Sequence, residues 1–167
     1  MSIIERIVES LLGDGGEKDK VPPVVLYRRN GIYMKAVPSK GRGLFCHEDI
    51  KAGELIEIAP VLILSENETS CIIPTILRDY AFNPKGLPIP PAMAAELNIQ
   101  DFDKASCLLM GVGSFCNHLV HPNAARENAG DSDTPMYRLK AIQDIPAGTE
   151  ITINYGIAWP AKHRKSF

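Results

Sequence analysis

Short runs of alternating apolar and polar residues dominate the chain from Val24 onward. The stretches VVLYR and IYMKAV read as strands, and Arg29-Asn30-Gly31 between them is typical of a hairpin turn. A further strand is predicted for residues 137–142. Residues 71–82 and 91–110 instead carry helical or irregular patterns, and prolines interrupt the region between them. The pattern predicts a mostly β fold with short helices between two β-rich ends.

One motif, a turn followed by a strand, occurs twice. Residues 48–58 (EDIKAGELIEI) and 143–153 (QDIPAGTEITI) share Asp-Ile-x-Ala-Gly followed by alternating apolar positions. Each glycine suits a turn with positive φ, and the alternation predicts a strand after it. The copies lie about 95 residues apart, too isolated for a solenoid. We expect a single domain that contains both.

The first 22 residues have a different pattern. Ser2-Ile-Ile-Glu5 has the form of a capping box, and a glycine-rich polar stretch follows at 13–20. We expect an amphipathic helix and a flexible linker over 1–22, a main domain over 23–156 and a basic tail over 157–167. Three alternatives are open for this helix: it docks on the main domain, it docks on another subunit and makes a homodimer, or it docks on nothing firm. Its apolar face comprises Ile3, Ile4, Ile7, Val8, Leu11 and Leu12.

Composition and charge narrow the class of protein. The chain has 167 residues, 45% hydrophobic and 23% charged, which is typical of one globular domain. Its net charge of −2 lacks the basic field of a dedicated nucleic-acid binder, so we expect no direct nucleic-acid partner. No apolar run reaches the ~18 residues that a membrane helix needs. We expect an intracellular protein: cytoplasmic if bacterial, with a nuclear protein or a secreted effector as alternatives.

Three polar or glycine-containing clusters carry the candidate chemistry: residues 39–45 (SKGRGLF), 111–123 (GVGSFCNHLVHPN) and 150–156 (EITINYG). The glycines at 41 and 43 are too few for a dinucleotide or phosphate loop, and a tight turn is an alternative explanation for them. Each cluster alone is a weak signal.

The cysteines and histidines allow two further readings. Cys116, His118 and His121 are residue types that bind zinc, but no second Cys/His pair completes a site, and we expect no metal. Cys116 as a nucleophile with a histidine base would require the two side chains to meet in space. The four cysteines are scattered without a C-x-x-C motif, so reduced thiols are the expectation.

Taken in order, Gly-Arg-Gly-Leu-Phe-Cys-x-x-Asp-Ile, Asn-His-x-x-x-Pro-Asn and Glu-Ile-Thr-Ile-Asn-Tyr-Gly resemble the SET-domain family of protein-lysine methyltransferases. The resemblance covers about residues 24–155. It implies a β-clip fold, with small sheets wrapped around a threaded loop (a pseudoknot) at the active site. It also implies methyl transfer from S-adenosylmethionine to a lysine of a protein, such as a histone or another basic protein.

The resemblance also implies roles for individual residues. Tyr155 matches the catalytic tyrosine, and Leu119 and Asn154 depart from the serine and aspartate that the family usually has. Cysteine-rich flanking segments are missing, as in the minimal bacterial and viral members, so we expect the tail 157–167 to close the substrate channel. The expected channel walls are Tyr80, Phe115 and Trp159. The expected cofactor-binding residues are Lys40, Gly41, Arg42, Gly43, Leu44, Asn117, His118 and Tyr155.

Such chemistry requires no metal, because a methyl group on a sulfonium is already activated. It does require a neutral amine, and neutralising a lysine at pH 7 costs roughly 4.6 kcal/mol, which an apolar aromatic channel reduces. A different class remains open: a non-catalytic β-clip module that binds a small metabolite. That class explains the repeated turn, but it leaves Asn117, His118 and Tyr155 without a role.

Overall fold

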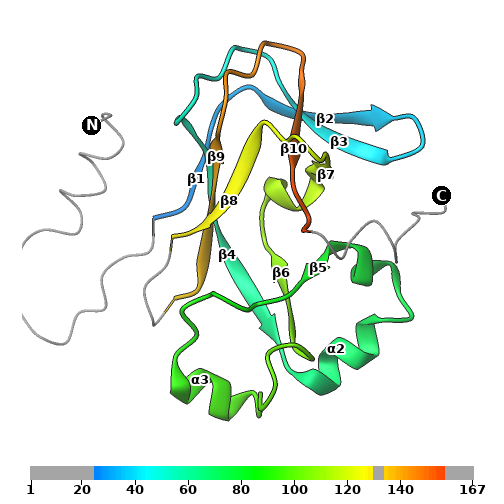
Figure 1. Ribbon diagram of the computed structural model, residues 1–167, viewed down its shortest axis with the longest axis vertical. Helices are drawn as coiled ribbons and strands as arrows, with labels where there is room; N and C mark the ends of the chain where they lie inside the picture. Colours follow the sequence, from blue (N-terminus) through cyan, green and yellow to red (C-terminus); the bar gives the residue numbers. More distant parts are fainter. Residues whose placement is uncertain (1–24, 130–133, 157–167) are drawn as a thin grey trace, which may run out of the picture.

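The computed structural model describes residues 25–129 and 134–156, which form two sheets and a small helical segment (Figure 1). The helix and linker expected over 1–22, and the tail expected over 157–167 with Trp159, lie outside the described residues. The expectation of a mostly β chain with short helices is confirmed.

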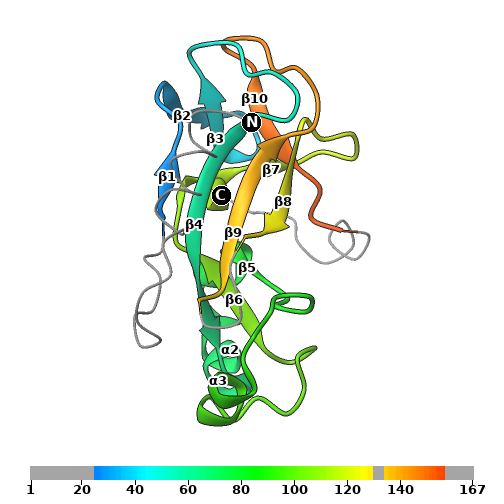
Figure 2. The ribbon, with the colours of Figure 1, turned by 90° about the vertical axis from the view of Figure 1, so that its left-hand side faces the viewer.

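The larger sheet is built on β4 (Leu55–Leu64), whose alternating side chains are buried on one face. Its strand order is β5-β6-β4-β9-β8, and β1 (Tyr27–Arg28) also pairs with β4. All of these pairs are antiparallel. In Figure 2, β4 and β9 run side by side along the length of the molecule. The other members are β5 (Ala81–Phe82), β6 (Ser106–Leu109), β8 (Ala124–Asn128) and β9 (Met136–Ala141).

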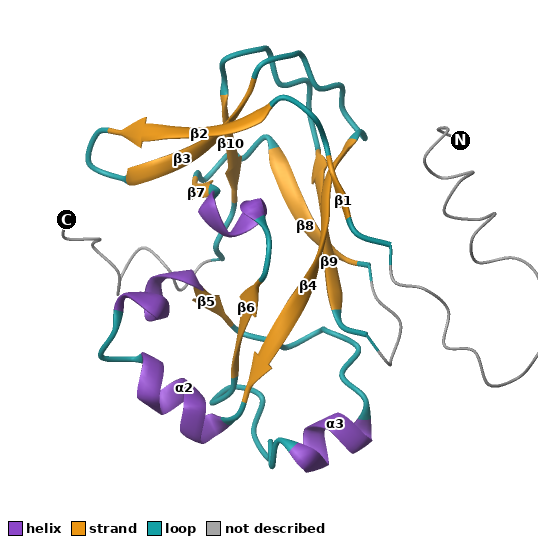
Figure 3. Cartoon of the chain, turned by 180° about the vertical axis from the view of Figure 1, so that it is seen from behind, coloured by secondary structure: helices purple, strands orange, loops and turns teal. Residues whose placement is uncertain are grey.

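The smaller sheet has the order β2-β3-β10-β7 and crosses one end of the larger sheet (Figure 3). Its strands are β2 (Ile32–Val37), β3 (Gly41–Cys46), β7 (Asn117–His118) and β10 (Glu150–Ile153). β10 pairs antiparallel with β3 but parallel with β7. This parallel pair places two stretches that are far apart in the sequence side by side.

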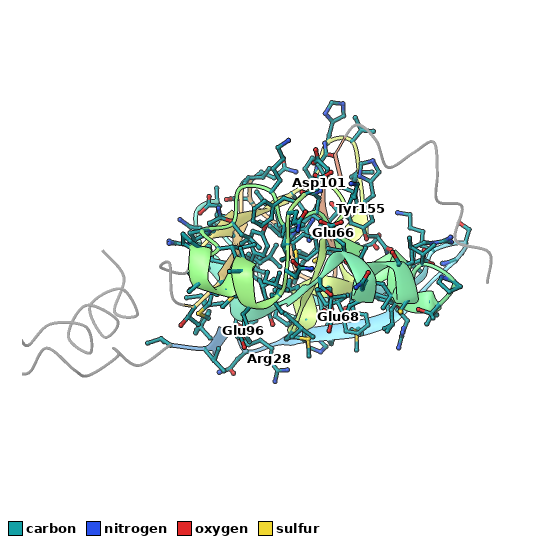
Figure 4. All side chains as sticks on the ribbon, turned by 90° about the horizontal axis from the view of Figure 1, so that it is seen from below. Arg28, Glu66, Glu68, Glu96, Asp101 and Tyr155 are labelled. Atoms are coloured by element: carbon teal, nitrogen blue, oxygen red, sulfur yellow. The ribbon has the colours of Figure 1, made fainter. Side chains whose placement is uncertain are left out.

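The segment 65–105 connects the end of β4 to the start of β6 and adds the edge strand β5 to the larger sheet. It contains α2 (Glu66–Ile72), the 3-10 helix η1 (Ile76–Tyr80) and α3 (Pro91–Glu96), while η2 (Val112–Phe115) follows β6. A Ser65–Glu68 capping box starts α2. The Glu66 carboxylate accepts hydrogen bonds from the backbone N–H groups of Gln100 (3.2 Å) and Asp101 (3.0 Å), which ties the segment together (Figure 4).

Two apolar cores support this arrangement. One lies around both repeats and the smaller sheet and includes Leu44, Ile50, Ile56, Cys116, Leu139, Ile145 and Ile151. The other lies beneath the lower part of β4 and includes Val61, Ile63, Leu87, Ile99, Cys107 and Leu109. The candidate site lies where elements from these two cores meet.

The two Asp-Ile-x-Ala-Gly repeats bind each other. The backbones of Ile50 and Ile145 exchange hydrogen bonds of 2.9 and 2.8 Å. Asp49 accepts from the Ala147 N–H (2.8 Å), and Asp144 accepts reciprocally from Ala52 (2.9 Å). The glycines after them, at 53 and 148, have φ of +86° and +76°, as predicted. The two repeats therefore connect the stretch before β4, in the larger sheet, with the stretch before β10, in the smaller sheet.

Two predictions about local structure are wrong. Arg29-Asn30-Gly31 does not join a hairpin, because β1 pairs with β4 and β2 pairs with β3. The turn instead leads the chain from one sheet to the other. Asn-Gly favours a tight turn, but the strands that pair are determined by packing and burial in the whole fold. Residues 106–109, expected to be helical or irregular, form β6 in the middle of the larger sheet. A four-residue apolar run is too short for periodicity to separate strand from helix.

Candidate active site

Tyr155 lies at the end of β10, next to the stretch that carries Asn117 and His118. The parallel register pairs Thr152 with Asn117 and Ile153 with His118. Two residues later, the Tyr155 N–H donates to Nδ1 of His118 (3.1 Å), and the two rings lie 5.5 Å apart. The expected proximity of these stretches is therefore found.

The Tyr155 side chain is held in one protonation state. Its hydroxyl donates a hydrogen bond to the Cys116 carbonyl at 2.5 Å. Burial, with a smaller contribution from Cys116, raises the pKa of Tyr155 to about 12. The hydroxyl is therefore neutral near pH 7. With its proton engaged by Cys116, its oxygen can accept an N–H from an incoming amine.

The expected cofactor residues gather around the Asn117 side chain. Asn117 is buried, and its Nδ2 donates to the Arg42 carbonyl (2.9 Å) and to Oε1 of Glu150 (2.6 Å). The Lys40 ammonium lies 3.6 Å from the other Glu150 oxygen. A Cβ on Gly43 would lie 2.5 Å from Glu150 Oε1, so any other residue here would displace the Glu150 carboxylate. We call Lys40–Leu44, Asn117, His118 and Glu150 the polar cluster.

A cavity of about 380 Å³ adjoins Tyr155 on the side of segment 65–105, within the size range of small-molecule sites. No residue of the polar cluster lines this cavity. Tyr155 therefore contacts His118 of the polar cluster through its backbone N–H and its ring. Tyr155 also lines the cavity (Figure 4). The lining relevant to the chemistry comes from Tyr80, Phe82, Ser114, Arg126, Ile153 and Tyr155.

The two aromatic residues expected as channel walls contact each other, but only one of them lines the cavity. Tyr80 and Phe115 meet edge to face at 5.7 Å. Arg42 lies 5.1 Å from the Phe115 ring and donates to the Tyr80 hydroxyl (3.2 Å). Tyr80 lines the cavity, whereas Phe115 does not. Trp159 lies outside the described residues.

Sequence reasoning assigned no role to three charged residues of this region: Glu57, Arg126 and Glu150, the last of which stands in the candidate cluster 150–156. Glu57 is only 5% exposed, and its carboxylate accepts from the N–H groups of Val112 (2.8 Å) and Gly113 (2.7 Å). It thereby holds η2, the turn that leads into Asn117. An acidic residue between the isoleucines of a buried strand was the available signal. The sequence offered no such signal for Arg126, because the residues of β8 form no apolar pattern.

The Cys–His alternatives find little support in the structure. Cys116 is buried, and its burial raises the pKa of the thiol above the ordinary range, which disfavours a nucleophilic thiolate. His118 is hydrogen-bonded to Tyr155, and His121 is exposed. Residues 25–129 and 134–156 contain no group of three or more metal-ligating side chains arranged to hold a metal ion. All four cysteines are free thiols.

The two departures from the family pattern have local backbone roles. Leu119 is exposed, and its N–H donates to the Ile153 carbonyl (3.0 Å), which extends the contact between β7 and β10. The Asn154 side chain accepts from the Gly156 N–H (2.7 Å) and shapes the turn around Tyr155. Neither replacement prevents the threaded arrangement.

Comparison with known proteins gives a consistent picture. The SET domain family profile matches residues 41–156. The Schizosaccharomyces pombe protein "Histone-lysine N-methyltransferase, H3 lysine-37 specific" is 28% identical over 129 residues, which cover 77% of this chain and 75% of the relative. Human "Histone-lysine N-methyltransferase 2B" is 28% identical over 127 residues, which cover 75% of this chain and 4% of that protein.

A solved structure supports the same fold. The Neurospora SET domain protein DIM-5, a histone lysine methyltransferase, superimposes with a TM-score of 0.56 at 26% identity. The match covers 75% of this chain and 52% of that one. The expected SET-like fold is thereby confirmed.

Proposed function

The chain belongs to the SET domain family of protein-lysine methyltransferases, and from this we propose that it transfers the methyl group of S-adenosylmethionine to a lysine side chain by way of Tyr155. One observation carries the proposal. Tyr155, whose neutral hydroxyl is half-buried, contacts the polar cluster through His118 and also lines the cavity. A two-substrate transfer requires a residue that adjoins both binding regions, because the two reactants must meet at one point.

The polar cluster has the chemistry to hold the cofactor. Residues Lys40–Leu44, at the start of β3, include no side chain at Gly43, and Lys40 adds a cation. Within the described chain, the Asn117 amide oxygen and Nε2 of His118 accept or donate no hydrogen bond, so both are available to a polar ligand. When bound, S-adenosylmethionine supplies a methyl group activated by its sulfonium.

The cavity side supplies the conditions for a reactive amine. The aromatic side chains of Tyr80, Phe82 and Tyr155 line it and reduce the solvation of an ammonium, which lowers the pKa of a lysine placed there. The Tyr155 oxygen accepts an N–H from that amine and directs its lone pair away from the hydroxyl. Orientation and desolvation are thus the contributions of this chain's own residues.

Histones or other basic proteins are the proposed substrates, because the named relatives are histone-lysine methyltransferases. We propose an intracellular location for the same reason. Among the described residues, no helix is long and apolar enough to cross a membrane.

Replacing Tyr155 with phenylalanine tests the proposal. Tyr155→Phe keeps the ring, so affinity for S-adenosylmethionine should change little, while loss of the hydrogen bond to the Cys116 carbonyl should lower stability by roughly 1 kcal/mol. Transfer of labelled methyl to a histone mixture should fall by about 100-fold, roughly 2.7 kcal/mol of transition-state stabilisation. Tyr33→Phe, a half-buried tyrosine on β2 away from the site, is the control.

Transfer at the wild-type rate in Tyr155→Phe would remove the tyrosine from catalysis. A wild-type protein that transfers no methyl group to any protein, yet binds a metabolite tightly, would favour the non-catalytic β-clip module.

A further inference from the structure

Arg126 brings a positive charge into the cavity that Tyr155 lines. It lies on β8, half-buried, and its guanidinium carbon is 4.2 Å from the centre of the Phe82 ring and 5.9 Å from that of Tyr137. These cation–π contacts hold the guanidinium beside the two rings. A cation–π contact takes up no N–H hydrogen bond, so the N–H groups are left for other partners.

The acidic residues of the cavity wall are already paired with other cations. Asp79 lies 3.7 Å from Nε of Arg78, and Asp103 lies 3.6 Å from Nζ of Lys85. Over residues 25–129 and 134–156, no carboxylate reaches Arg126 within 4.0 Å, and no acceptor takes its N–H groups. None of its side-chain nitrogens is buried without a partner, and Arg126 lines the cavity.

A guanidinium with free N–H edges is complementary to a carboxylate, which it binds with two parallel hydrogen bonds. The same charge repels the ammonium and guanidinium groups that flank a lysine in a wholly basic segment. Burial raises the pKa of Tyr155, and the charge of Arg126 opposes that rise. The field of Arg126 therefore reaches the hydroxyl to which the amine is directed.

We propose that Arg126 binds a carboxylate of the protein substrate, so that the enzyme prefers a lysine with an aspartate or glutamate close by. The inference rests on the proposed function, because it assigns the cavity to the lysine-bearing substrate. It narrows the substrate class from any lysine of a basic protein to lysines in a locally mixed-charge sequence.

The test uses short lysine-centred peptides that carry one glutamate, or one glutamine, at each flanking position in turn. The readout is the ratio of kcat/KM for the glutamate peptide to that for its glutamine twin. For wild type, at least one position should favour glutamate by about tenfold or more, as expected for a charge-assisted hydrogen bond. Arg126→Gln should bring that ratio close to one.

Arg78→Gln is the matched control: it removes the same charge from the same wall, but that guanidinium is already paired with Asp79. It should keep the wild-type preference for glutamate. Arg126→Lys retains the charge without the planar fork and should give an intermediate ratio. This variant also serves if Arg126→Gln fails to fold, since a ratio unchanged in Arg126→Lys would count against the bidentate contact.

Four results would overturn the inference. An equal glutamate preference in wild type and Arg126→Gln would exclude Arg126 from substrate selection while leaving the proposed function intact. Loss of S-adenosylmethionine affinity by calorimetry, with an unchanged peptide ratio, would assign Arg126 to the cofactor's own carboxylate. An equal fall in kcat for both peptides would indicate a general electrostatic effect on the amine. A wild type that methylates neither these peptides nor any protein would remove the proposed function and this inference with it.

Discussion

At the scale of single residues, the site depends on which polar groups are engaged and which are free. The Tyr155 hydroxyl is engaged by Cys116, and the Asn117 amide nitrogen by Arg42 and Glu150. The amide oxygen of Asn117 remains available to a ligand. The sequence resemblance identified both residues. It did not identify Glu150, whose carboxylate fixes Asn117 from a position that reads as an ordinary strand start.

The effect of Tyr155 burial on the free energy of unfolding should become measurable at alkaline pH. Its pKa is about 12 in the folded chain and about 10 in the unfolded one. Since the folded state favours the neutral hydroxyl, this stabilisation is fully present below pH ~10 and is lost as the pH rises through ~12, in total roughly 2–3 kcal/mol. Urea unfolding at about pH 8 and pH 12 should show a larger loss of unfolding free energy for wild type than for Tyr155→Phe.

The buried thiols of Cys107 and Cys116 also resist ionisation, but both proteins contain them, so their effect cancels in the comparison. Identical alkaline losses in wild type and Tyr155→Phe would contradict the burial of this hydroxyl.

Asn117→Ala should weaken S-adenosylmethionine binding by on the order of 1–3 kcal/mol, because it removes an amide from the proposed site and leaves the Glu150 carboxylate without its donor. Calorimetry measures the affinity. Asn67→Ala, on the exposed face of α2, is the control. Unchanged affinity in a folded Asn117→Ala protein would remove Asn117 from the cofactor site.

At the scale of elements, local patterns predicted turns and strands well and pairing poorly. Both Asp-Ile-x-Ala-Gly turns and the strands after them were predicted, because a glycine with positive φ and apolar alternation are local signals. The partner of β2 was not, because it depends on β3, a strand that is buried only in the finished fold. Similarly, β6 is too short to be recognised from its own four residues.

The turn η2 depends on a carboxylate from β4. Glu57→Gln replaces one accepting oxygen with an amide nitrogen, which faces an N–H of Val112 or Gly113 and leaves that donor unpaired. Thermal and urea unfolding should show a loss of roughly 1–3 kcal/mol. Methyl transfer should fall as well, because η2 leads into Asn117. Glu96→Gln, exposed on α3, should change neither property, and an equally stable Glu57→Gln protein would show that η2 does not need this anchor.

At the scale of the whole molecule, the parallel contact of β7 with β10 creates the site, and no local signal predicts it. Thr152 and Asn117 pair across 35 positions of sequence, through a chain that first crosses the larger sheet. Only resemblance to a known family indicated this threading. Arg126 reaches the cavity by the same long-range packing, which is why its position could not be predicted.

Chelation should leave both the fold and the activity intact. Cys116, His118 and His121 do not converge: one is buried, one is bonded to Tyr155, and one is exposed. Treatment with EDTA should therefore change neither the melting temperature nor methyl transfer, whereas a structural zinc would contribute directly to folding. Stoichiometric zinc in the purified protein would contradict this expectation.

The segment 65–105 has its two ends fastened together, because Leu64 and Ser106 pair directly between β4 and β6. Closing a loop costs only about 0.6 kcal/mol more for each doubling of its length. The length of the segment therefore has little effect on the stability of the rest of the fold. Yet it contributes Arg78, Tyr80, Phe82 and Asp103 to the cavity wall, and none of the polar cluster. Under the proposed function, exchange of this one segment changes the part of the substrate cavity that it lines, beside Arg126 of β8, and leaves the polar cluster unchanged.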